Sequence, residues 1–280
     1  MSVFLTGATG LVGSAILARL RELDRDVTAL VRDPAKRAAV AATGATVLDG
    51  DITDLELVAT AAASSSGVIH TASPGDASSA AVDEAFARSV LTALEGTDIP
   101  YVHTGGVWVF GNGNDLTESS PQQPPAITSW RGPVESLVRS SSVRTTIIAP
   151  GIVYGPTGGG IAGILQPDAS GTVRLVGDGH QHWTTVHVED LADLYVLALD
   201  AAQPDAYYLG VSGQNPTVRQ IGEASAHGAT VVEETQKESR ARLGEAFADA
   251  LLIDQQSRAS GAVAELGWAP RRPSLLDVVA

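Results

Sequence analysis

The stretch TGATGLVGS, residues 6–14, decides the fold of this 280-residue chain. An apolar run at 3–5 precedes it, and an apolar helical pattern starts directly after it, at Leu11. A strand, a glycine-rich turn and a helix in this order cradle a pyrophosphate, because the helix start offers unpaired N–H groups and the positive end of its dipole. We therefore interpret residues 6–14 as a nucleotide-binding turn with GxxGxxG spacing, built on Gly7, Gly10 and Gly13. The alternative is a tight turn that binds nothing.

The first 150 residues repeat this alternation of strand and helix. Strands are predicted at 2–6, 27–32, 45–49, 67–71, 99–104 and 144–149, and helices at 11–23, 34–42, 54–63, 77–95 and 128–141. Asp33 before Pro34 is typical of a helix N-cap, and residues 53–56 are typical of a capping box. Six such repeats predict an α/β fold with a doubly wound, Rossmann-like parallel sheet.

The pattern changes after Pro150. Residues 155–160 have the composition of a flexible loop. Helices are predicted at 189–202, 217–226, 238–250 and 256–265, with a strand at 206–211. We expect a dinucleotide-binding part at 1–155. A smaller substrate lobe at 156–280 would lie over the carboxyl end of the sheet, with parts returning to the core.

Composition excludes several classes of function. The net charge of −14 argues against a nucleic-acid partner or an anionic membrane. There is no cysteine, which excludes disulfides and thiolate catalysis, and six scattered histidines give no metal-binding spacing. The sequence shows neither a signal peptide nor a long apolar span, so we expect a cytoplasmic protein.

Arg32 predicts which nicotinamide cofactor binds. It ends the second predicted strand, 19 residues after Gly13, where an NAD enzyme usually places an acid that accepts the ribose hydroxyls. A guanidinium there pairs well with a 2′-phosphate, and the neighbouring Asp33 is expected to be used as a helix cap. The sequence therefore favours NADP(H) over NAD(H). The alternative is that Arg32 is a solvated surface charge.

Five further stretches resemble the short-chain dehydrogenase/reductase superfamily, in its extended or atypical branch of epimerase-like proteins. They are GDI at 50–52, VIHTA at 68–72, TIIAPGIVYGP at 146–156, TVHVEDLA at 185–192, and LGWAP at 266–270. The resemblance implies cofactor contacts near adenine, along the nucleotide and near the nicotinamide. With the glycine turn and Arg32, these contacts are Gly7, Thr9, Gly10, Leu11, Val12, Gly13, Arg32, Asp51, Ile52, Thr71, Ala72, Thr104, Arg131, Pro150 and Val153.

The sequence departs from this superfamily at its catalytic motif. Members usually carry Tyr-xxx-Lys and an upstream serine or threonine, but here the only lysines are Lys36 and Lys237. Aligned on the following Val-Glu, Ile127 takes the tyrosine position and Arg131 the lysine position. Upstream, glycines at 105–106 replace serines, so that Thr104 is the surviving hydroxyl.

Three residues remain as catalytic candidates. Arg131 could hold the ribose or a phosphate, but it is a poor proton donor. Tyr154, in the VYGP element, is the first candidate for the proton, and Thr104 could orient a carbonyl. For Tyr154 and Thr104, a purely structural role stays open, as it does for the tryptophans at 130 and 183 that could line a pocket.

Three functions follow from these patterns. The first is an NADP(H)-dependent reductase of a small carbonyl, imine or activated alkene. The second is a non-catalytic NADP(H) sensor that regulates a partner, and the third is a sugar-nucleotide epimerase or dehydratase. The resemblance also implies a monomer or a homodimer formed through the helices at 77–95 and 128–141.

Overall fold

The computed structural model describes residues 1–156 and 159–280. Residues 157 and 158, in the predicted loop at 155–160, lie outside the described part. The chain divides into two compact units. Unit 1 comprises residues 1–105, 131–149 and 192–208, and unit 2 comprises residues 106–130, 150–191 and 209–280. The two units interleave along the sequence, because unit 2 is built from three separate segments.

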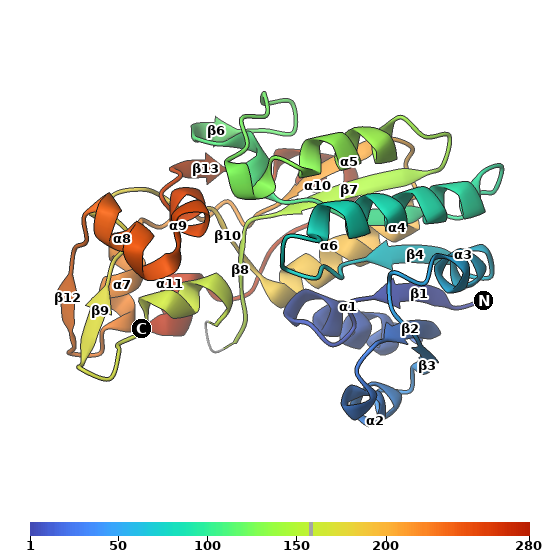
Figure 1. The fold of residues 1–280 in the computed structure, drawn as a ribbon, viewed down its shortest axis with the longest axis horizontal. Coiled ribbons are helices and arrows are strands. Elements are labelled where there is room, and N and C mark those ends of the chain that lie inside the picture. Colours follow the sequence, from blue (N-terminus) through green and yellow to red (C-terminus); the bar gives the residue numbers. More distant parts are fainter. Residues whose placement is uncertain (157–158) are drawn as a thin grey trace. The chain divides into compact units, whose positions relative to one another are not determined.

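A seven-stranded sheet forms the centre of unit 1 (Figure 1). Its order is β11-β7-β5-β4-β1-β2-β3, and the neighbours from β7 to β3 pair in parallel. The strands are β1 (Val3–Thr6), β2 (Val27–Val31), β3 (Thr46–Asp49), β4 (Gly67–His70), β5 (Tyr101–Thr104), β7 (Thr145–Pro150) and β11 (Ala206–Gly210). The strand order reverses at β1, next to β4. The predicted doubly wound α/β fold is confirmed.

Helices flank this sheet. They are α1 (Leu11–Glu22), α2 (Arg37–Ala41), α3 (Leu55–Ala63), α4 (Ser79–Leu94), α5 (Arg131–Arg139) and α6 (Val188–Ala201). Helices α3, α4 and α5 contact one another in series. Helix α1 is joined to α6 by an ion pair of 2.6 Å between Arg19 Nε and Asp193 Oδ1. The strands between them are buried because their side chains face helices.

Two helix starts test the capping predictions. Asp33 accepts a hydrogen bond from the Ala35 N–H at 2.9 Å, so the predicted cap is confirmed, although it opens a 3-10 turn, η1 (Pro34–Lys36), ahead of α2. The predicted capping box at 53–56 is wrong. Asp54 caps α3 by accepting from the Leu57 N–H at 3.1 Å, while the Thr53 hydroxyl donates to Asp51 instead.

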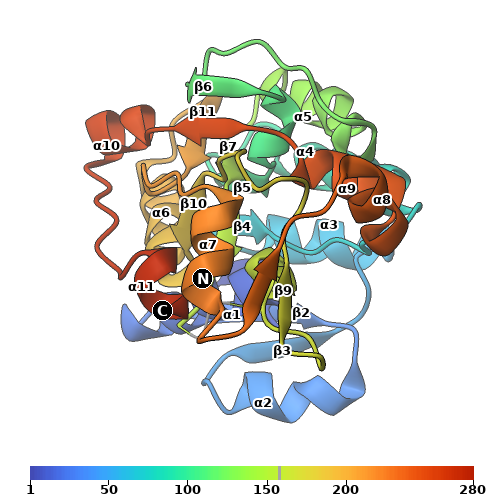
Figure 2. The same ribbon diagram turned by 90° about the vertical axis from the view of Figure 1, so that its left-hand side faces the viewer.

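Unit 2 is built from short elements (Figure 2). Three strand pairs form: β6 (Gly113–Leu116) with β13 (Gln255–Ser257), β8 (Ile152–Tyr154) with β10 (Thr185–His187), and β9 (Thr172–Arg174) with β12 (Thr230–Val232). The 3-10 turns are η2 (Val107–Phe110), η3 (Ala126–Thr128) and η4 (Gly160–Leu165). The helices are α7 (Val218–Ser225), α8 (Gln236–Leu243), α9 (Glu245–Leu251), α10 (Ser260–Leu266) and α11 (Leu275–Val279).

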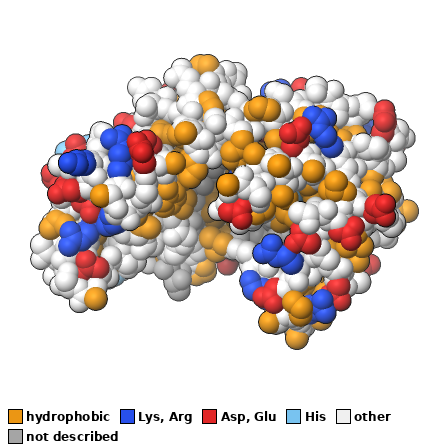
Figure 3. Space-filling view, in the orientation of Figure 1, with side chains coloured by type: hydrophobic (Ala, Val, Ile, Leu, Met, Phe, Trp, Pro, Cys, Tyr) orange, Lys and Arg blue, Asp and Glu red, His pale blue; other side chains and the backbone are white. Residues whose placement is uncertain are grey.

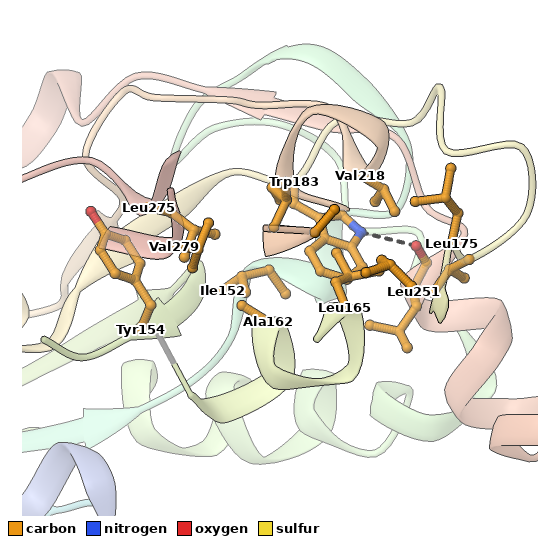
Figure 4. Close-up of a cluster of buried hydrophobic side chains, with 14 residues drawn as sticks. Ile152, Tyr154, Ala162, Leu165, Leu175, Trp183, Val218, Leu251, Leu275 and Val279 are labelled. Atoms are coloured by element: carbon orange, nitrogen blue, oxygen red, sulfur yellow. Dashed lines mark hydrogen bonds between the residues drawn. The ribbon is translucent and has the colours of Figure 1, made fainter. Parts of the chain in front are cut away.

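The core of unit 2 surrounds Trp183. Its indole Nε1 donates to the Leu251 carbonyl at 3.0 Å, as the dashed line in Figure 4 shows. This bond connects the segment just before β10 to the last residue of α9. One helix was expected over 238–250, but the structure has two, because the chain turns at Gly244 with a φ of +85°, which glycine adopts at low cost.

Charged side chains of both signs lie on the surface. On the face shown in Figure 3, acidic and basic side chains are interspersed, and no basic patch gathers there. Among the described residues, no helix combines the length and the apolar character that a membrane crossing would need.

Candidate functional site

The glycine turn lies between β1 and α1 in unit 1, beside the end of β4. Gly7 has a φ of +76°, and a Cβ on it would lie 2.4 Å from Thr71 Oγ1. A Cβ on Gly13 would lie 2.1 Å from the Gly7 carbonyl oxygen, so helix and turn approach too closely for a side chain. A Cβ on Gly10 would meet nothing nearer than 3.4 Å. Two glycines are thus required by the fold, whereas Gly10 leaves space that a ligand can use.

The start of α1 has the properties of an anion site. Gly10 occupies the N-cap position, and no side chain caps the helix. The N–H groups of the first turn therefore stay available, together with the positive end of the dipole of a 12-residue helix. Leu11 is 44% exposed beside them. These features fit a dinucleotide pyrophosphate, as at other glycine-rich strand–helix turns.

A cavity of about 220 Å³ opens beside the turn. It brings together the glycine turn, the end of β2, the loop after β3 and the loop after β4. Its lining residues are Gly7, Thr9, Gly10, Leu30, Arg32, Gly50, Asp51, Ile52, Thr71, Ala72, Ser73 and Pro74. Eight of the residues predicted from sequence to bind cofactor line this one cavity. Leu30, Ser73 and Pro74 are members that sequence reasoning missed.

Arg32 lines the same cavity, and its side chain is 76% exposed. Its Nη1 lies 3.6 Å from Asp51 Oδ2. Partial burial would raise the pKa of Asp51, but hydrogen bonds from the Thr53 N–H and hydroxyl, with the charge of Arg32, outweigh it and lower that pKa. Asp51 is therefore an anion that lies beside the Arg32 guanidinium in the lining of the cavity.

A second group of polar residues lies at the carboxyl end of β5, also in unit 1. The Arg131 Nη1 donates to the Thr104 carbonyl at 3.0 Å. The Thr104 hydroxyl donates to the His70 carbonyl at 2.6 Å and lies 2.6 Å from the Tyr195 hydroxyl. Threonine has one hydroxyl proton, so Tyr195 is the donor in the second bond. The structure thus joins Thr104 and Arg131, and it adds Tyr195.

Tyr195 was not found from the sequence. It lies on α6 in an apolar helical pattern, where nothing separates it from ordinary core residues. Burial raises the pKa of its phenol well above the ordinary value, and the bond to Thr104 opposes this only in part. Only the side-chain contact seen in three dimensions marks it out.

A buried polar cluster lies next to Thr104 on the other side of β5. Asp83 accepts from His70 Nε2 at 3.0 Å and faces His103 Nε2 at 3.5 Å. The Tyr101 hydroxyl bonds to His103 Nδ1 at 2.8 Å, and Thr6 Oγ1 lies 2.7 Å from His70 Nδ1. His103 thus points toward α4, while Thr104 points toward α6, as their alternation on a strand predicts.

Protonation in this cluster follows from burial. Burial lowers the pKa of His70 and outweighs the Asp83 carboxylate, which acts in the opposite direction. Burial alone would raise the pKa of Asp83, but the neighbouring imidazoles of His103 and His70 dominate and hold it well below its usual range. A buried carboxylate beside the two imidazoles therefore connects β4 and β5 to α4.

Gly105 stands where a serine is expected from the sequence, and a neighbouring carboxylate fills the space that a side chain would need. A Cβ on Gly105 would lie 2.6 Å from Oε1 of Glu135, and Glu135 is 2% exposed. A serine at 105 would have to displace that buried side chain. Ile127, at the tyrosine position, lies on η3 in unit 2 and is 36% exposed.

Tyr154, Pro150 and Val153 belong to unit 2. Pro150 ends β7, and Val153 pairs with Val186 between β8 and β10. The Tyr154 hydroxyl donates to the Pro273 carbonyl at 2.8 Å, and Figure 4 shows it pointing away from the surrounding apolar side chains. The residue is 1% exposed, and burial raises the pKa of its phenol to about 12.

The histidines give no metal site. His180 Nδ1 pairs with Asp178 at 3.2 Å, and His182 Nδ1 pairs with Asp254 at 2.9 Å. Within the part of the chain that the structure describes, no three His, Cys, Asp or Glu side chains gather as a metal ion requires.

The outer face of α4 is mainly polar. Glu84, Arg88, Thr92 and Glu95 are exposed along it, and Arg88 pairs with Glu84 at 2.7 Å. Helices α4 and α5 pack together, with apolar side chains directed inward. The homodimer through these helices stays a prediction.

Comparison with known proteins identifies the family. The model of the NAD dependent epimerase/dehydratase family matches residues 3–210, which is most of the chain. The chain therefore belongs to this family and has its NAD(P)-binding fold.

Individual relatives agree with this assignment. An uncharacterized protein of Schizosaccharomyces pombe is 28% identical, over 100% of this chain and 98% of its own length. A 3-diazoavenalumate denitrifying reductase of a Streptomyces species is 25% identical, over 99% of this chain and 98% of its own length. The structure of a dTDP-glucose 4,6-dehydratase from Streptomyces venezuelae with NAD bound superposes with a TM-score of 0.80 at 20% identity, covering 100% of this chain and 95% of that one.

Proposed function

We propose that this protein is an NADP(H)-dependent oxidoreductase that reduces a small carbonyl, imine or activated alkene at an atypical active site. One observation carries the cofactor assignment. Arg32 lines the same cavity as the glycine turn, while the rival Asp33 is engaged by the Ala35 N–H. A guanidinium in that cavity favours a 2′-phosphate. The full-length similarity to a reductase of Streptomyces supports the reaction class.

The proposed cofactor contacts follow the cavity. Gly7, Gly10 and Gly13, with Leu11 and Val12 at the start of α1, would hold the pyrophosphate. The loop residues 51–52 and 71–72 would contact adenine and the nucleotide, and Thr9 would stand at the turn. Arg131 would hold the ribose or a phosphate, and Pro150 and Val153 would lie near the nicotinamide. When bound, NADPH supplies the hydride.

The proposed catalytic residues are Thr104, Arg131 and Tyr154. Thr104 would orient the acceptor, with Tyr195 as its hydrogen-bond partner on α6. Arg131 fixes the end of β5 through the Thr104 carbonyl. Tyr154 would serve as the proton donor only after it releases the Pro273 carbonyl. The pKa of about 12 also makes its phenol a weak acid near neutral pH.

A calorimetric titration with NADPH, NADP and NADH, followed by an acceptor screen, tests the proposal. We expect tight NADPH binding, weak NADH binding, and consumption of NADPH with at least one acceptor. Failure to bind any of the three would overturn it.

A regulatory NADP(H) sensor is the second candidate. Ile127 and the glycines at 105–106 stand where the superfamily has its tyrosine and serines, which favours a protein without turnover. A ligand shifts an equilibrium only through differential affinity, so a sensor must distinguish NADP from NADPH. Equal affinities for the two would exclude this candidate, and turnover would make it unnecessary.

A further inference from the structure

Tyr195 is a fully buried side chain of unit 1 that carries a hydroxyl into the interior. Among the described residues, this hydroxyl has one partner, Thr104 Oγ1, at 2.6 Å. A buried hydroxyl gives up its bonds to water, and the single bond to Thr104 replaces them only in part. Packing alone would be served as well by phenylalanine, so the hydroxyl is better explained by what it holds.

Thr104 connects Tyr195 to the wall of the cavity beside the glycine turn. The Thr104 hydroxyl donates to the His70 carbonyl at 2.6 Å and so fixes the peptide that leads into Thr71. Thr71 lines the cavity, and its own hydroxyl donates to the Thr6 carbonyl at 2.9 Å. A continuous path of contacts thus runs from α6 through the ends of β5 and β4 to the cavity.

The position of Thr71 matters because it lies directly against the glycine turn. A Cβ on Gly7 would lie 2.4 Å from Thr71 Oγ1, and a Cβ on Gly13 would lie 2.8 Å from the same atom. Any displacement of the peptide between His70 and Thr71 would therefore change the shape of the cavity where the turn would hold the pyrophosphate.

A second proposed cofactor contact depends on the same threonine. Arg131 Nη1 donates to the Thr104 carbonyl at 3.0 Å, so the backbone of Thr104 helps to orient the guanidinium. The Thr104 hydroxyl accepts from Tyr195 and donates to His70, which leaves its side chain one orientation that satisfies both partners. Tyr195 therefore fixes the residue that stands between Arg131 and Thr71.

We propose that Tyr195 is a positioning residue for the cofactor, which through Thr104 holds Thr71 and Arg131 in the arrangement that binds NADPH. This rests on the proposed NADPH-dependent function. Tyr195 is not among the described residues that line the cavity, so it acts without touching the ligand. Side chains that are held in place before binding lose little conformational entropy when the ligand binds, which increases affinity.

Calorimetric titration with NADPH tests this role. Tyr195→Phe keeps the ring and removes the hydroxyl, and we expect it to bind NADPH about tenfold more weakly than the natural protein. Thr104→Val removes the next bond of the path and should weaken binding at least as much. Thr104→Ser keeps a hydroxyl at the same place and should bind within about twofold of the natural protein. Equal affinities of the valine and serine variants would contradict the proposal.

Thr145→Val is the matched control. Thr145 is 1% exposed in unit 1, and its hydroxyl donates to the Val138 carbonyl at 3.2 Å, away from the described residues that line the cavity. Loss of this bond should lower the urea concentration at half-unfolding, as Tyr195→Phe should, but should leave NADPH affinity unchanged. Unchanged affinity in Tyr195→Phe, or an equal loss in Thr145→Val, would overturn the proposal.

The double variant Tyr195→Phe with Thr104→Val tests whether the two residues act along one path. It should bind NADPH as weakly as Thr104→Val alone, because the losses do not add when one residue acts through the other. Additive losses would mean that Tyr195 acts apart from Thr104, against the proposal. Equally tight binding by the natural protein and by Tyr195→Phe would overturn the positioning role and leave the NADP(H) assignment standing. Absence of NADPH binding by the natural protein would remove both.

Discussion

The glycine turn after β1 and the polar group after β5 lie in the same unit, yet they differ in what specifies them. The turn is defined by backbone positions. Gly7 and Gly13 leave no space for a Cβ, and α1 has no side-chain cap. The group around Thr104 is defined by the side chains of Thr104, Arg131 and Tyr195, and from the sequence we expect it to depart from the superfamily motif at Arg131. A cofactor site made of backbone can therefore stay intact while the chemistry beside it changes.

The largest effect should come from Gly13→Val. Its Cβ would lie 2.1 Å from the Gly7 carbonyl oxygen, so α1 must move away from the turn. We expect a loss of about 3 kcal/mol in the free energy of unfolding and no detectable NADPH binding. Gly10→Val is the matched variant, since a Cβ at this position would lie 3.4 Å from its nearest neighbour, the Gly7 carbonyl oxygen. It should unfold like the natural protein but bind NADPH about a hundredfold more weakly. Normal binding by Gly10→Val would mean that the turn is only structural.

Removing the buried carboxylate tests whether the two regions share support. Asp83→Leu leaves the N–H of His70 without its acceptor and removes the carboxylate that faces His103, so we expect a loss of about 3 kcal/mol in chemical denaturation. Asp83→Asn should cost less, because its amide can still hydrogen-bond an imidazole that changes tautomer. If both variants were as stable as the natural protein, the cluster would not stabilise the sheet.

Arg32→Asp tests the cofactor preference without touching the turn. Its side chain is 76% exposed, so the fold should be unaffected. Replacing a guanidinium by a carboxylate beside a 2′-phosphate should weaken NADPH binding between about tenfold and a hundredfold. NADH binding should change little. Equal losses for both cofactors would contradict the NADP(H) assignment, and Arg37→Asp is a control on a nearby arginine that pairs with Asp49.

Acid should weaken unit 1 through His70. Its pKa is lowered in the folded protein, so the unfolded chain binds the proton more readily. The stabilising effect is complete above the ordinary pKa of 6.5 and is lost as the pH falls below that value. We expect a loss of about 1 kcal/mol per pH unit from this residue, measured by denaturation between pH 7 and 5. His70→Gln should flatten this slope, and an unchanged slope would mean that another group is responsible.

Much of unit 1 was predictable from sequence, because its signals are local. The strand ends of β1, β2 and β4 and the cap at Asp33 follow from apolar runs and turn residues that lie next to one another in the chain. In unit 2, pairs such as β9 and β12 join three-residue strands far apart in the sequence, and such strands are too short for alternation to show.

The residues of the candidate site also divide into those that the sequence indicated and those that only the structure shows. Most residues that line the cavity are among the expected cofactor contacts, since they come directly after strands of the sheet. The bond from Tyr195 to Thr104 was not, because it connects residues 91 positions apart on different elements. Glu135 is a similar case. Its carboxylate leaves no space for a side chain at Gly105 because α5 lies close to the end of β5, and the sequence does not show that distance.

Tyr154→Phe should have the smallest effect on stability, and it decides between two interpretations of that residue. The phenol donates to the Pro273 carbonyl at 2.8 Å, so its removal should cost about 1 kcal/mol of unfolding free energy. NADPH affinity should stay unchanged. If Tyr154 is the proton donor, kcat should fall between about a hundredfold and ten-thousandfold. If its role is to hold the Pro273 segment, kcat should stay within about twofold, whereas Thr104→Val should lower it further because that hydroxyl stands at the end of β5.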